Sequence, residues 1–350
     1  MKRYFGIDLV RVLAVFFVLS VHFFLNNSFY DTNINGIGMF ISIFLRWIFY
    51  NGVPLFILLT GYLKRKKKLD KDYYKGIKHI LLSYLFISII CIIFRILFIK
   101  EHISKLKLLF GIFNFSANGY AWYLEMYIGL FLLIPFLNIL YDGLKTKKNK
   151  EHLIITLLLM ISLSPIISSI TIRGIKLDII PDWWNEIYPL IYYFIGCYIN
   201  EYQVEINKKK GILLTIGLIL IETILSYVVN YNDTFSWNFL GGYGSLQTVI
   251  ISTTIFLLLY KVNCNKKKIN KIITNISILS LDIYLFSYIV DQITYPILDG
   301  YLENPVEYLK FYILIIILIF SVSYLLSYIK KIIFDITEKK YIERKNKKSV

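Results

Sequence analysis

Charged residues are scarce in this sequence. Asp, Glu, Lys and Arg make up 18% of its 350 residues, whereas a soluble globular domain carries roughly a quarter. A surface so poor in charge cannot face water along its whole extent, so the composition excludes an ordinary soluble protein. Hydrophobic residues make up 57%. They come in runs of about 20, the length with which an α-helix crosses about 30 Å of hydrocarbon, so we expect a protein that spans a membrane several times.

Cysteine is scarce too, with three residues. Cys91 and Cys197 fall within apolar runs and Cys264 in a basic loop, so no disulfide framework can form without joining different compartments. The sequence also lacks a small-residue cleavage site after its first apolar run, although Lys2 and Arg3 precede that run as in a secretory signal. We therefore expect the first run to be retained as a helix.

Ten apolar runs can be placed along the chain. Their length, and the lack of an alternating pattern, favour helices over a membrane barrel. No repeat, low-complexity linker or long loop interrupts them. We predict an all-α polytopic protein with a single transmembrane domain over residues 1–350 and a basic cytoplasmic tail at 334–350. The predicted spans are 5–25, 37–63, 77–99, 122–141, 153–172, 187–201, 211–229, 243–260, 274–295 and 309–333.

The distribution of cations predicts the orientation. The net charge is +16, but Lys and Arg cluster between apolar runs, as at 64–68, 208–210 and 266–268, which is not the pattern of a nucleic-acid-binding face. With the amino terminus inside the cell, 30 of the 39 Lys and Arg lie in inner segments, six in outer loops and three within spans. Inner segments of membrane proteins carry such an excess, so both termini are predicted to be cytoplasmic.

Several ionisable residues lie inside the predicted spans. A charged side chain near the centre of a bilayer costs at least about 2.5–3.5 kcal/mol, so its presence there needs a reason. Such residues can pair with one another to hold helices together, or they can form a functional site, and the sequence leaves both alternatives open. They are Asp8, Arg11, His22, Arg46, Arg95, Glu125, Glu222, Asp282 and Asp291.

The first span carries the strongest functional pattern. Arg11 and His22 are eleven residues apart, which is close to three turns of helix, so they share one face about 16 Å apart along the axis. His22 is the one histidine of four that lies well inside a predicted span. A histidine aligned with a buried arginine predicts acid–base or nucleophilic catalysis. The other histidines, at the ends of spans, are His79, His102 and His152.

Four stretches together resemble the acyltransferase 3 family of membrane O-acyltransferases. Arg11 and His22, within the stretch that begins Ile7-Asp8-Leu9-Val10-Arg11-Val12-Leu13-Ala14, are similar to the family's first helix. The segment Gly52-Val53-Pro54-Leu55-Phe56-Ile57-Leu58-Leu59-Thr60-Gly61-Tyr62-Leu63 resembles its Val-Pro-Leu-Phe-Phe…Ser-Gly-Tyr stretch. The other two are Trp122-Tyr123-Leu124-Glu125 followed by Ile128-Gly129-Leu130, and Ser280-Leu281-Asp282-Ile283-Tyr284-Leu285. Their order and spacing carry the resemblance from residue 7 to about 290.

The chain departs from the family pattern at two places. The family's cytosolic Arg-x-x-Arg is Lys75-Gly76-Ile77-Lys78 here, which keeps the charge but loses bidentate binding of phosphate. A histidine usually follows the late element in the family, whereas Phe286 and Ser287 follow it here. A second catalytic histidine is therefore not expected.

The resemblance implies transfer of an acyl group, commonly acetyl, from cytosolic acetyl-CoA to a hydroxyl of an extracytoplasmic glycan or lipid-linked sugar. It implies His22 as general base or acyl carrier, and Glu125 as a second base or a residue that orients His22. Arg11 would hold the pantetheine arm, a phosphate or the thioester oxygen, and Lys75 and Lys78 would contact phosphate. No metal and no nucleic acid is implied. The expected location, among membrane lipids, is the cell membrane, in bacteria the cytoplasmic membrane.

Alternatives stay open from the sequence. The lysines at 64–78 are also what the positive-inside rule alone would place there. A polysaccharide or lipid transporter or flippase would place charges along a path between repeated halves, and no internal repeat is visible. Aromatic residues beside amides in the outer loops suit sugars, but interfacial belts use the same types. These residues are Phe29, Tyr30, Trp183, Trp184, Trp237, Phe239, Asn26, Asn27, Asn185 and Asn238.

Overall fold

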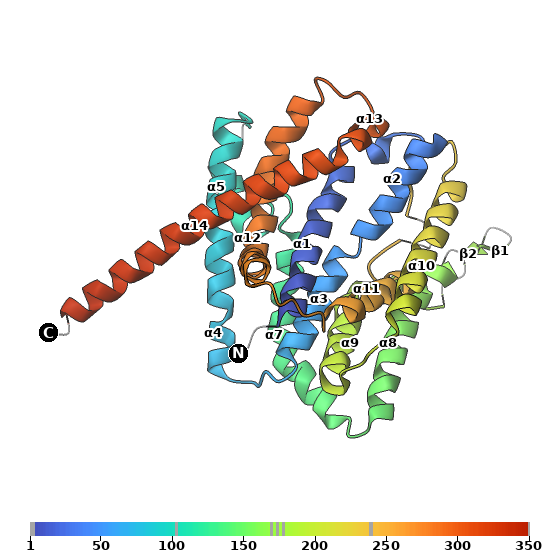
Figure 1. Ribbon diagram of the computed structural model, residues 1–350, viewed down its shortest axis with the longest axis horizontal. Helices are drawn as coiled ribbons and strands as arrows, with labels where there is room; N and C mark the ends of the chain where they lie inside the picture. The colour runs from blue at the N-terminus through green and yellow to red at the C-terminus, as the bar shows by residue number, and fades with distance from the viewer. Residues whose placement is uncertain are drawn as a thin grey trace.

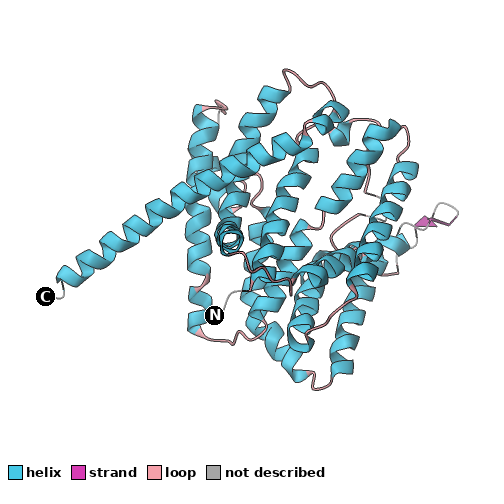
Figure 2. Cartoon of the chain, in the orientation of Figure 1, coloured by secondary structure: helices cyan, strands magenta, loops and turns pink. Residues whose placement is uncertain are grey.

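A computed structural model of the protein describes residues 4–101, 104–168, 171–172, 175–176, 179–237 and 241–348. Helices form almost all of this part of the chain and lie together as a bundle (Figure 1, Figure 2). Strands occur in it only as one antiparallel pair of two residues each, β1 (Thr171–Ile172) and β2 (Ile175–Lys176). The predicted all-α class is confirmed.

The helices follow the apolar runs closely. Eight segments of the described chain are long and apolar enough to cross a membrane, with α2 and α3 counted together and α4 and α5 counted together. The protein is therefore polytopic, as predicted. The helices are α1 (Phe5–Leu25), α2 (Gly36–Phe49), α3 (Gly52–Lys64), α4 (Lys71–Lys75), α5 (Ile77–Leu97), α6 (Lys105–Phe113), α7 (Trp122–Gly143), α8 (Lys147–Ser168), α9 (Tyr188–Tyr202), α10 (Lys208–Val229), α11 (Leu246–Leu259), α12 (Lys267–Leu298), α13 (Pro305–Lys310) and α14 (Tyr312–Lys348), with short 3₁₀ turns η1 (Phe29–Asp31) and η2 (Asp182–Ile187).

The predicted number of about ten spans differs from these eight because two helices are short. The predicted spans 187–201 and 243–260 correspond to α9, with 15 residues, and α11, with 14 residues. Both pack against α3 inside the bundle. A helix surrounded by protein need not match the full hydrocarbon thickness with its own apolar surface, so hydropathy alone does not define its length.

The predicted span 37–63 is a broken helix. Pro54 has no N–H for the Tyr50 carbonyl, and its ring crowds the preceding turn, so α2 ends at Phe49 and α3 begins at Gly52. The Asn51 side chain satisfies the break, since its Nδ2 donates to the Trp47 carbonyl (2.8 Å) and its Oδ1 accepts from Ser252 Oγ (2.6 Å). The Asn51 side chain thus satisfies a backbone group at the break, as apolar surroundings require.

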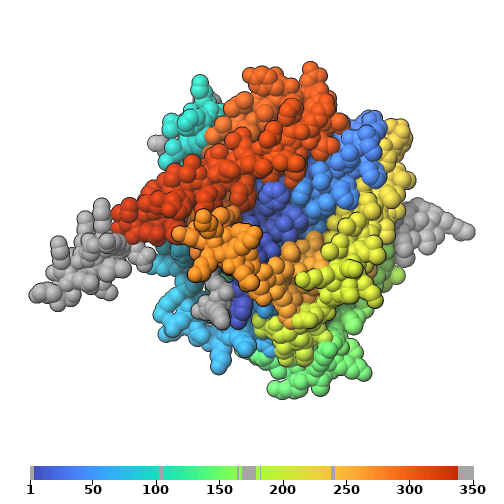
Figure 3. All heavy atoms as spheres, viewed as in Figure 1, coloured from blue at the N-terminus to red at the C-terminus, as the bar shows by residue number. Residues whose placement is uncertain are grey.

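Helix α1 lies at the centre of the bundle and contacts α2, α3, α11, α12 and α14. Val10, Ala14 and Val15 on α1 are fully buried. Figure 3 shows α14 lying across one face of the molecule, and Figure 1 shows its carboxyl-terminal part extending beyond the bundle. The first predicted span is therefore an internal helix with most of its surface covered by protein.

Two of the ionisable residues in the predicted spans, Asp282 and Arg95, follow the pairing alternative. Lys330 Nζ lies 2.6 Å from Asp282 Oδ1, and Ser83 bonds to both groups, which joins α14, α12 and α5. Arg95 forms a two-pronged contact with Glu101 (2.7 and 2.9 Å). The hydrogen bonds from Arg95 lower the pKa of Glu101. These groups hold elements together.

The closest helix contact joins α3 and α9 through glycine. A Cβ on Gly196 would overlap the Leu58 carbonyl oxygen, and one on Gly61 would overlap the Tyr193 carbonyl oxygen. Gly196→Ala is therefore expected to destabilise the fold by at least about 1–3 kcal/mol, the cost of overpacking. Gly129→Ala is the matched control, because open space surrounds Gly129. The measurement is the melting temperature of each variant in detergent, and equal values would contradict this packing.

The orientation predicted from the cations can be tested by labelling cysteines with an impermeant maleimide. Cys91 and Cys197 are buried and Cys264 is half-buried. Asn33 and Lys145 are exposed, in loops on opposite predicted sides. We expect Asn33→Cys to react in intact cells, and Lys145→Cys and Cys264 to react only after permeabilisation. Labelling of Cys264 in sealed cells would reverse the predicted orientation.

Candidate active site

A cavity of about 270 Å³ lies between α1, α3, α5, α7 and α12. Most of its wall is apolar or aromatic, with a few polar groups, which is the usual composition of a small-molecule site. The polar lining residues other than tyrosines are Arg11, Thr60, Lys64, His22, Ser277 and Ser280, and the aromatic ones are Phe56, Trp122, Tyr123, Tyr127, Tyr243 and Tyr284.

Arg11 and His22 line this same cavity. The prediction that they share a face of the first helix is confirmed by this placement. Their separation of eleven residues corresponds to about 16 Å along α1, so the two residues mark the two ends of the cavity. Helix α3 contributes Val53, near its start, and Lys64, at its end. Because α3 is antiparallel to α1, Lys64 lies at the end of the cavity marked by Arg11.

The Arg11 end is tied to α12. Asp8 is buried and accepts hydrogen bonds from Thr274 Oγ1 (3.0 Å) and Ser277 Oγ (2.7 Å). Arg11 Nη1 lies 3.4 Å from the same Ser277 oxygen. Ser277 therefore connects the carboxylate and the guanidinium and fixes both relative to α12.

His22 lies against an aromatic ring at the other end. Its ring centroid is 3.8 Å from that of Tyr120, and Nδ1 is buried with no hydrogen-bond partner among the described residues. The Tyr120 hydroxyl donates to Asp291 Oδ2 (2.7 Å) and accepts from Asn26 Nδ2 (3.0 Å). Asn26 Nδ2 also donates to the His22 carbonyl (2.8 Å). We call Tyr120, Asn26 and Asp291 the His22 support.

Sequence reasoning missed part of this support. Asp291 stood among the ionisable residues within spans, but nothing in the sequence connects it to His22, since 269 positions separate them. Tyr120 precedes the Trp122 motif and is one of 29 tyrosines, so no signal distinguishes it. The Tyr284 hydroxyl bonds to the Tyr120 carbonyl, which places α12 and the start of α7 around the same histidine.

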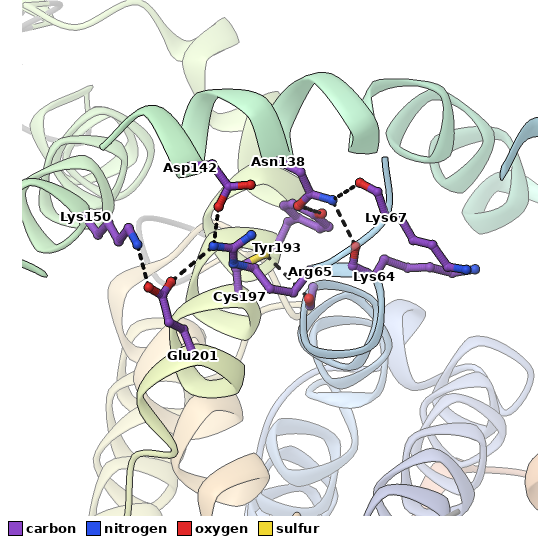
Figure 4. Close-up of polar contacts among 10 residues, drawn as sticks. Lys64, Arg65, Lys67, Asn138, Asp142, Lys150, Tyr193, Cys197 and Glu201 are labelled. Carbon is purple, nitrogen blue, oxygen red and sulfur yellow. Dashed lines mark hydrogen bonds and ion pairs between the residues drawn. The ribbon is translucent and has the colours of Figure 1, made fainter. Parts of the chain in front are cut away.

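Lys64 is the other lining residue that the sequence did not single out. It ends α3 and is close enough to Arg11 and Lys67 to interact with their charge. The loop that follows is held by α7, because Asn138 Nδ2 donates to the carbonyls of Lys64 (2.9 Å) and Lys67 (2.8 Å), while Tyr193 donates to Asn138 (2.7 Å) (Figure 4). The basic cluster at 64–68 therefore begins at the cavity in a fixed conformation.

A second hollow of about 490 Å³ lies beside this loop. Arg65 lies on its wall and is neutralised, since its Nη2 lies 2.6 Å from Asp142 and 3.3 Å from Glu201 (Figure 4). Lys150 also contacts Glu201, at 2.6 Å. No ion pair of the described chain involves Lys64 or the other lysines of this loop, which are Lys66, Lys67 and Lys68.

The structure does not bring the other predicted site residues to the cavity. Lys75 and Lys78 are exposed, and Lys75 pairs with Asp72 at 2.5 Å. Glu125 is exposed and is not among the lining residues. On α7, Tyr123 and Tyr127 line the cavity, and a residue midway between two such positions points to the opposite side of the helix. The proposed roles of these three charged residues stay predictions.

The remaining histidines lie elsewhere. His79 and His152 are exposed, and His102 lies outside the described residues. Within the described part of the chain, no group of three or more His, Cys, Asp or Glu side chains is arranged to hold a metal ion.

The comparisons with known proteins agree with the motifs. The family model described as an acyltransferase domain matches residues 4–328, which include both ends of the cavity and the His22 support. No significant match is found among curated proteins or among solved structures. The chain is a multi-pass membrane protein that belongs to the acyltransferase 3 family, and this membership implies acyltransferase activity.

Proposed function

We propose that the protein transfers an acetyl group from acetyl-CoA to a hydroxyl of a glycan or lipid-linked sugar on the opposite side of the membrane. The observation that carries this proposal is one cavity with a guanidinium at one end and a buried imidazole at the other. With the predicted orientation, Arg11 faces the cytoplasmic half of the bilayer and His22 the outer half. A cytosolic donor and an external acceptor would then reach the same cavity from opposite ends.

The donor end suits acetyl-CoA by size and charge. About 270 Å³ is below the 300–1,000 Å³ typical of pockets for drug-sized ligands, so the cavity would take the acetyl-pantetheine arm and leave the nucleotide outside. The nucleotide carries phosphates, which Lys and Arg bind. Lys64, Lys66, Lys67 and Lys68 lie at the adjoining loop and are our candidates for these contacts.

Either role for His22 is compatible with its position. As general base, His22 takes the proton of the acceptor hydroxyl while that oxygen attacks the thioester carbonyl, and the leaving thiolate takes the proton as the carbon–sulfur bond breaks. As carrier, an imidazole nitrogen bonds to the acyl carbon, the carbon–sulfur bond breaks, and the thiol leaves with the imidazole proton. The sugar hydroxyl then attacks the acyl carbon, the carbon–nitrogen bond breaks, and the imidazole takes the hydroxyl proton. An imidazolium formed in the first case would lie on the Tyr120 face, which attracts cations.

The geometry limits what Arg11 can do. If the reacting carbonyl lies at His22, Arg11 begins about 16 Å away along α1. We therefore propose that Arg11 holds the pantetheine arm or a phosphate of the donor, and not the thioester oxygen. Ser277 and Asp8 would orient the guanidinium for this contact.

Removing the Lys64 charge should weaken donor binding. Lys64→Ala is expected to raise the KM for acetyl-CoA about 5- to 10-fold with little change in kcat, because a contact remote from the reacting bond is equal in ground and transition states. The double variant Lys75→Ala, Lys78→Ala tests the positions predicted from the sequence in the same assay. If the KM for acetyl-CoA increases more in the double variant than in Lys64→Ala, the phosphates of the donor bind at Lys75 and Lys78, away from the cavity.

The proposed function is tested by supplying labelled acetyl-CoA to membranes with and without the gene. Label in surface glycan or lipid-linked sugar should appear only with the gene and should be lost in His22→Ala membranes. A transporter or flippase would change the amount of glycan outside the cell and leave acetyl incorporation unchanged. That outcome would overturn the acetyl-transfer proposal.

A further inference from the structure

A second buried cation lies outside the cavity. Arg46, on α2, has no exposed surface. Its Nε donates to the Tyr30 hydroxyl (2.8 Å). The guanidinium carbon lies 3.9 Å from the Trp237 ring centroid and 4.2 Å from that of Phe235. Trp47 and Tyr50 complete the surroundings at 5.0 and 5.4 Å. We call these five aromatic residues the Arg46 cage.

Two of the three guanidinium nitrogens in the Arg46 cage make no hydrogen bond to the described chain. Arg46 Nη1 and Nη2 are buried and have no hydrogen-bond partner in the described chain. Glu222, on the neighbouring α10, is also buried, and it interacts with the side chain of Gln247. It is near enough to influence Arg46 electrostatically but forms no ion pair with it. Buried charges are normally hydrogen-bonded or paired, so Arg46 Nη1 and Nη2 are two donors with which an anion can bond.

Two predicted outer loops close the cage as a cap. Tyr30 lies in the loop between α1 and α2, and Phe235 and Trp237 follow α10. Backbone bonds join the loops, from Ile34 N to the Asp233 carbonyl (2.8 Å) and from Asn232 N to the Ile34 carbonyl (2.9 Å). Trp237 is 38% exposed, so one wall of the cage is part of the protein surface. These rings therefore pack around Arg46.

Aromatic stacks connect the cage to the catalytic cavity. The Tyr50 ring, beside Arg46, lies 5.1 Å from that of Trp237 and stacks on Tyr243 at 4.4 Å. Tyr243 stacks in turn on Trp122 at 5.9 Å, and both line the cavity. A row of ring faces therefore runs from the surface at Trp237 to the cavity that holds His22.

We propose that Arg46 is an anion-binding residue of the acceptor path, which recognises an acidic group on the sugar that is acylated or next to it. Binding would require the cap to lift, with the acidic group replacing Tyr30, Phe235 and Trp237 around the guanidinium. A carboxylate of the sugar and a phosphate of its lipid carrier share the necessary chemistry, since both accept two N–H bonds from arginine. This inference rests on the proposed function for the identity of the ligand as acceptor.

The first test compares acceptors that differ in a single charged group. Phenyl β-glucuronide is paired with phenyl β-glucoside, and polyprenyl-diphosphate glucose with polyprenyl glucoside. Wild-type protein in membranes is expected to prefer an anionic acceptor over its neutral partner by about 10-fold or more in kcat/KM, as for a charge-assisted hydrogen bond. The pair that shows the preference identifies the carboxylate or the phosphate. Equal rates within both pairs would overturn the inference while leaving acyl transfer intact.

Variants separate anion binding from a structural role. Arg46→Gln should reduce the ratio of anionic to neutral kcat/KM to about 1, whereas Glu222→Gln, in the same surroundings, should retain it. If the only role of Arg46 is to neutralise the charge of Glu222, the double variant Arg46→Gln, Glu222→Gln would recover the wild-type ratio of anionic to neutral kcat/KM. That recovery, or a ratio unchanged in Arg46→Gln, would contradict the inference.

A binding measurement covers the case in which Arg46→Gln does not fold or no acceptor is acylated. Glucuronate is titrated against wild-type protein in nanodiscs, with glucose as the neutral probe, and tryptophan emission is followed. Because Trp237 lies on the guanidinium, glucuronate should cause a saturable change that glucose does not cause and that Trp237→Phe lacks. Inorganic phosphate provides the same test for the phosphate source. No change with either anion would overturn the inference independently of acyl transfer.

Discussion

Replacement of His22 by alanine is expected to abolish acyl transfer while the protein remains inserted and folded. General acid–base catalysis contributes about 10²–10⁴-fold, and a covalent role contributes more, so the loss should exceed any effect of local repacking. His22 supplies no hydrogen bond through Nδ1 to the rest of the described chain, so the fold does not depend on that atom. The measurement is acetyl incorporation in membranes, with the melting temperature in detergent as the test of folding.

The other histidines supply the controls. His79→Ala and His152→Ala change exposed side chains and should keep near wild-type rates, and we predict the same for His102→Ala. A folded His22→Ala protein that still transfers acetyl at the wild-type rate would show that His22 neither takes the proton nor carries the acyl group. Asp291 and Tyr120, the polar neighbours at that end of the cavity, would then be the next residues to test.

Arg11→Lys is expected to lower kcat/KM for acetyl-CoA by about 10- to 100-fold. Lysine keeps the positive charge beside Asp8 but loses the planar fork that grips two oxygens at once, and hydrogen bonds to charged groups contribute about 1.5–3 kcal/mol. The residue lines the cavity and touches Ser277. Donor kinetics in membranes measure the effect, and an unchanged kcat/KM would limit Arg11 to an electrostatic or structural role.

Ser277→Ala tests whether Ser277 contacts the donor itself or only orients the Arg11 guanidinium. The Ser277 hydroxyl bonds to Asp8 and to Arg11, so its loss leaves the guanidinium in place with one restraint fewer. We expect a smaller decrease in kcat/KM than for Arg11→Lys. A larger one would mean that Ser277 itself contacts the donor.

The apolar runs and the spacing of residues within single helices were sufficient to predict the helices and the α1 face that lines the cavity. Apolar runs of membrane length leave no alternative to helices, and the spacing of Arg11 and His22 in a single helix fixes their shared face by geometry alone. The same periodicity applied to α7 separates Glu125 from Tyr123 and Tyr127. The family motif around Trp122 contains Tyr123 and Glu125, so the resemblance alone could not show which of the two lines the cavity.

Contacts between distant segments were not predictable from one sequence. Tyr120 and Asp291 are 171 residues apart and meet only because α12 packs beside the start of α7. Lys64 looks like its basic neighbours until α3 is placed antiparallel to α1. The Arg46 cage joins two loops about 200 residues apart, and only two of its rings, Tyr30 and Trp237, were among the outer-loop aromatics that suit sugars or a lipid interface. Tertiary packing decides each of these cases.

The central claim is that donor and acceptor reach one cavity from opposite sides of the membrane. Sealed vesicles of one orientation, with the amino-terminal face of the protein outside and the acceptor glycan enclosed, test it directly. Labelled acetyl-CoA added outside should label the enclosed glycan, and vesicles carrying His22→Ala should show no label. Acetylation that occurs only when donor and acceptor are on the same face would contradict the account.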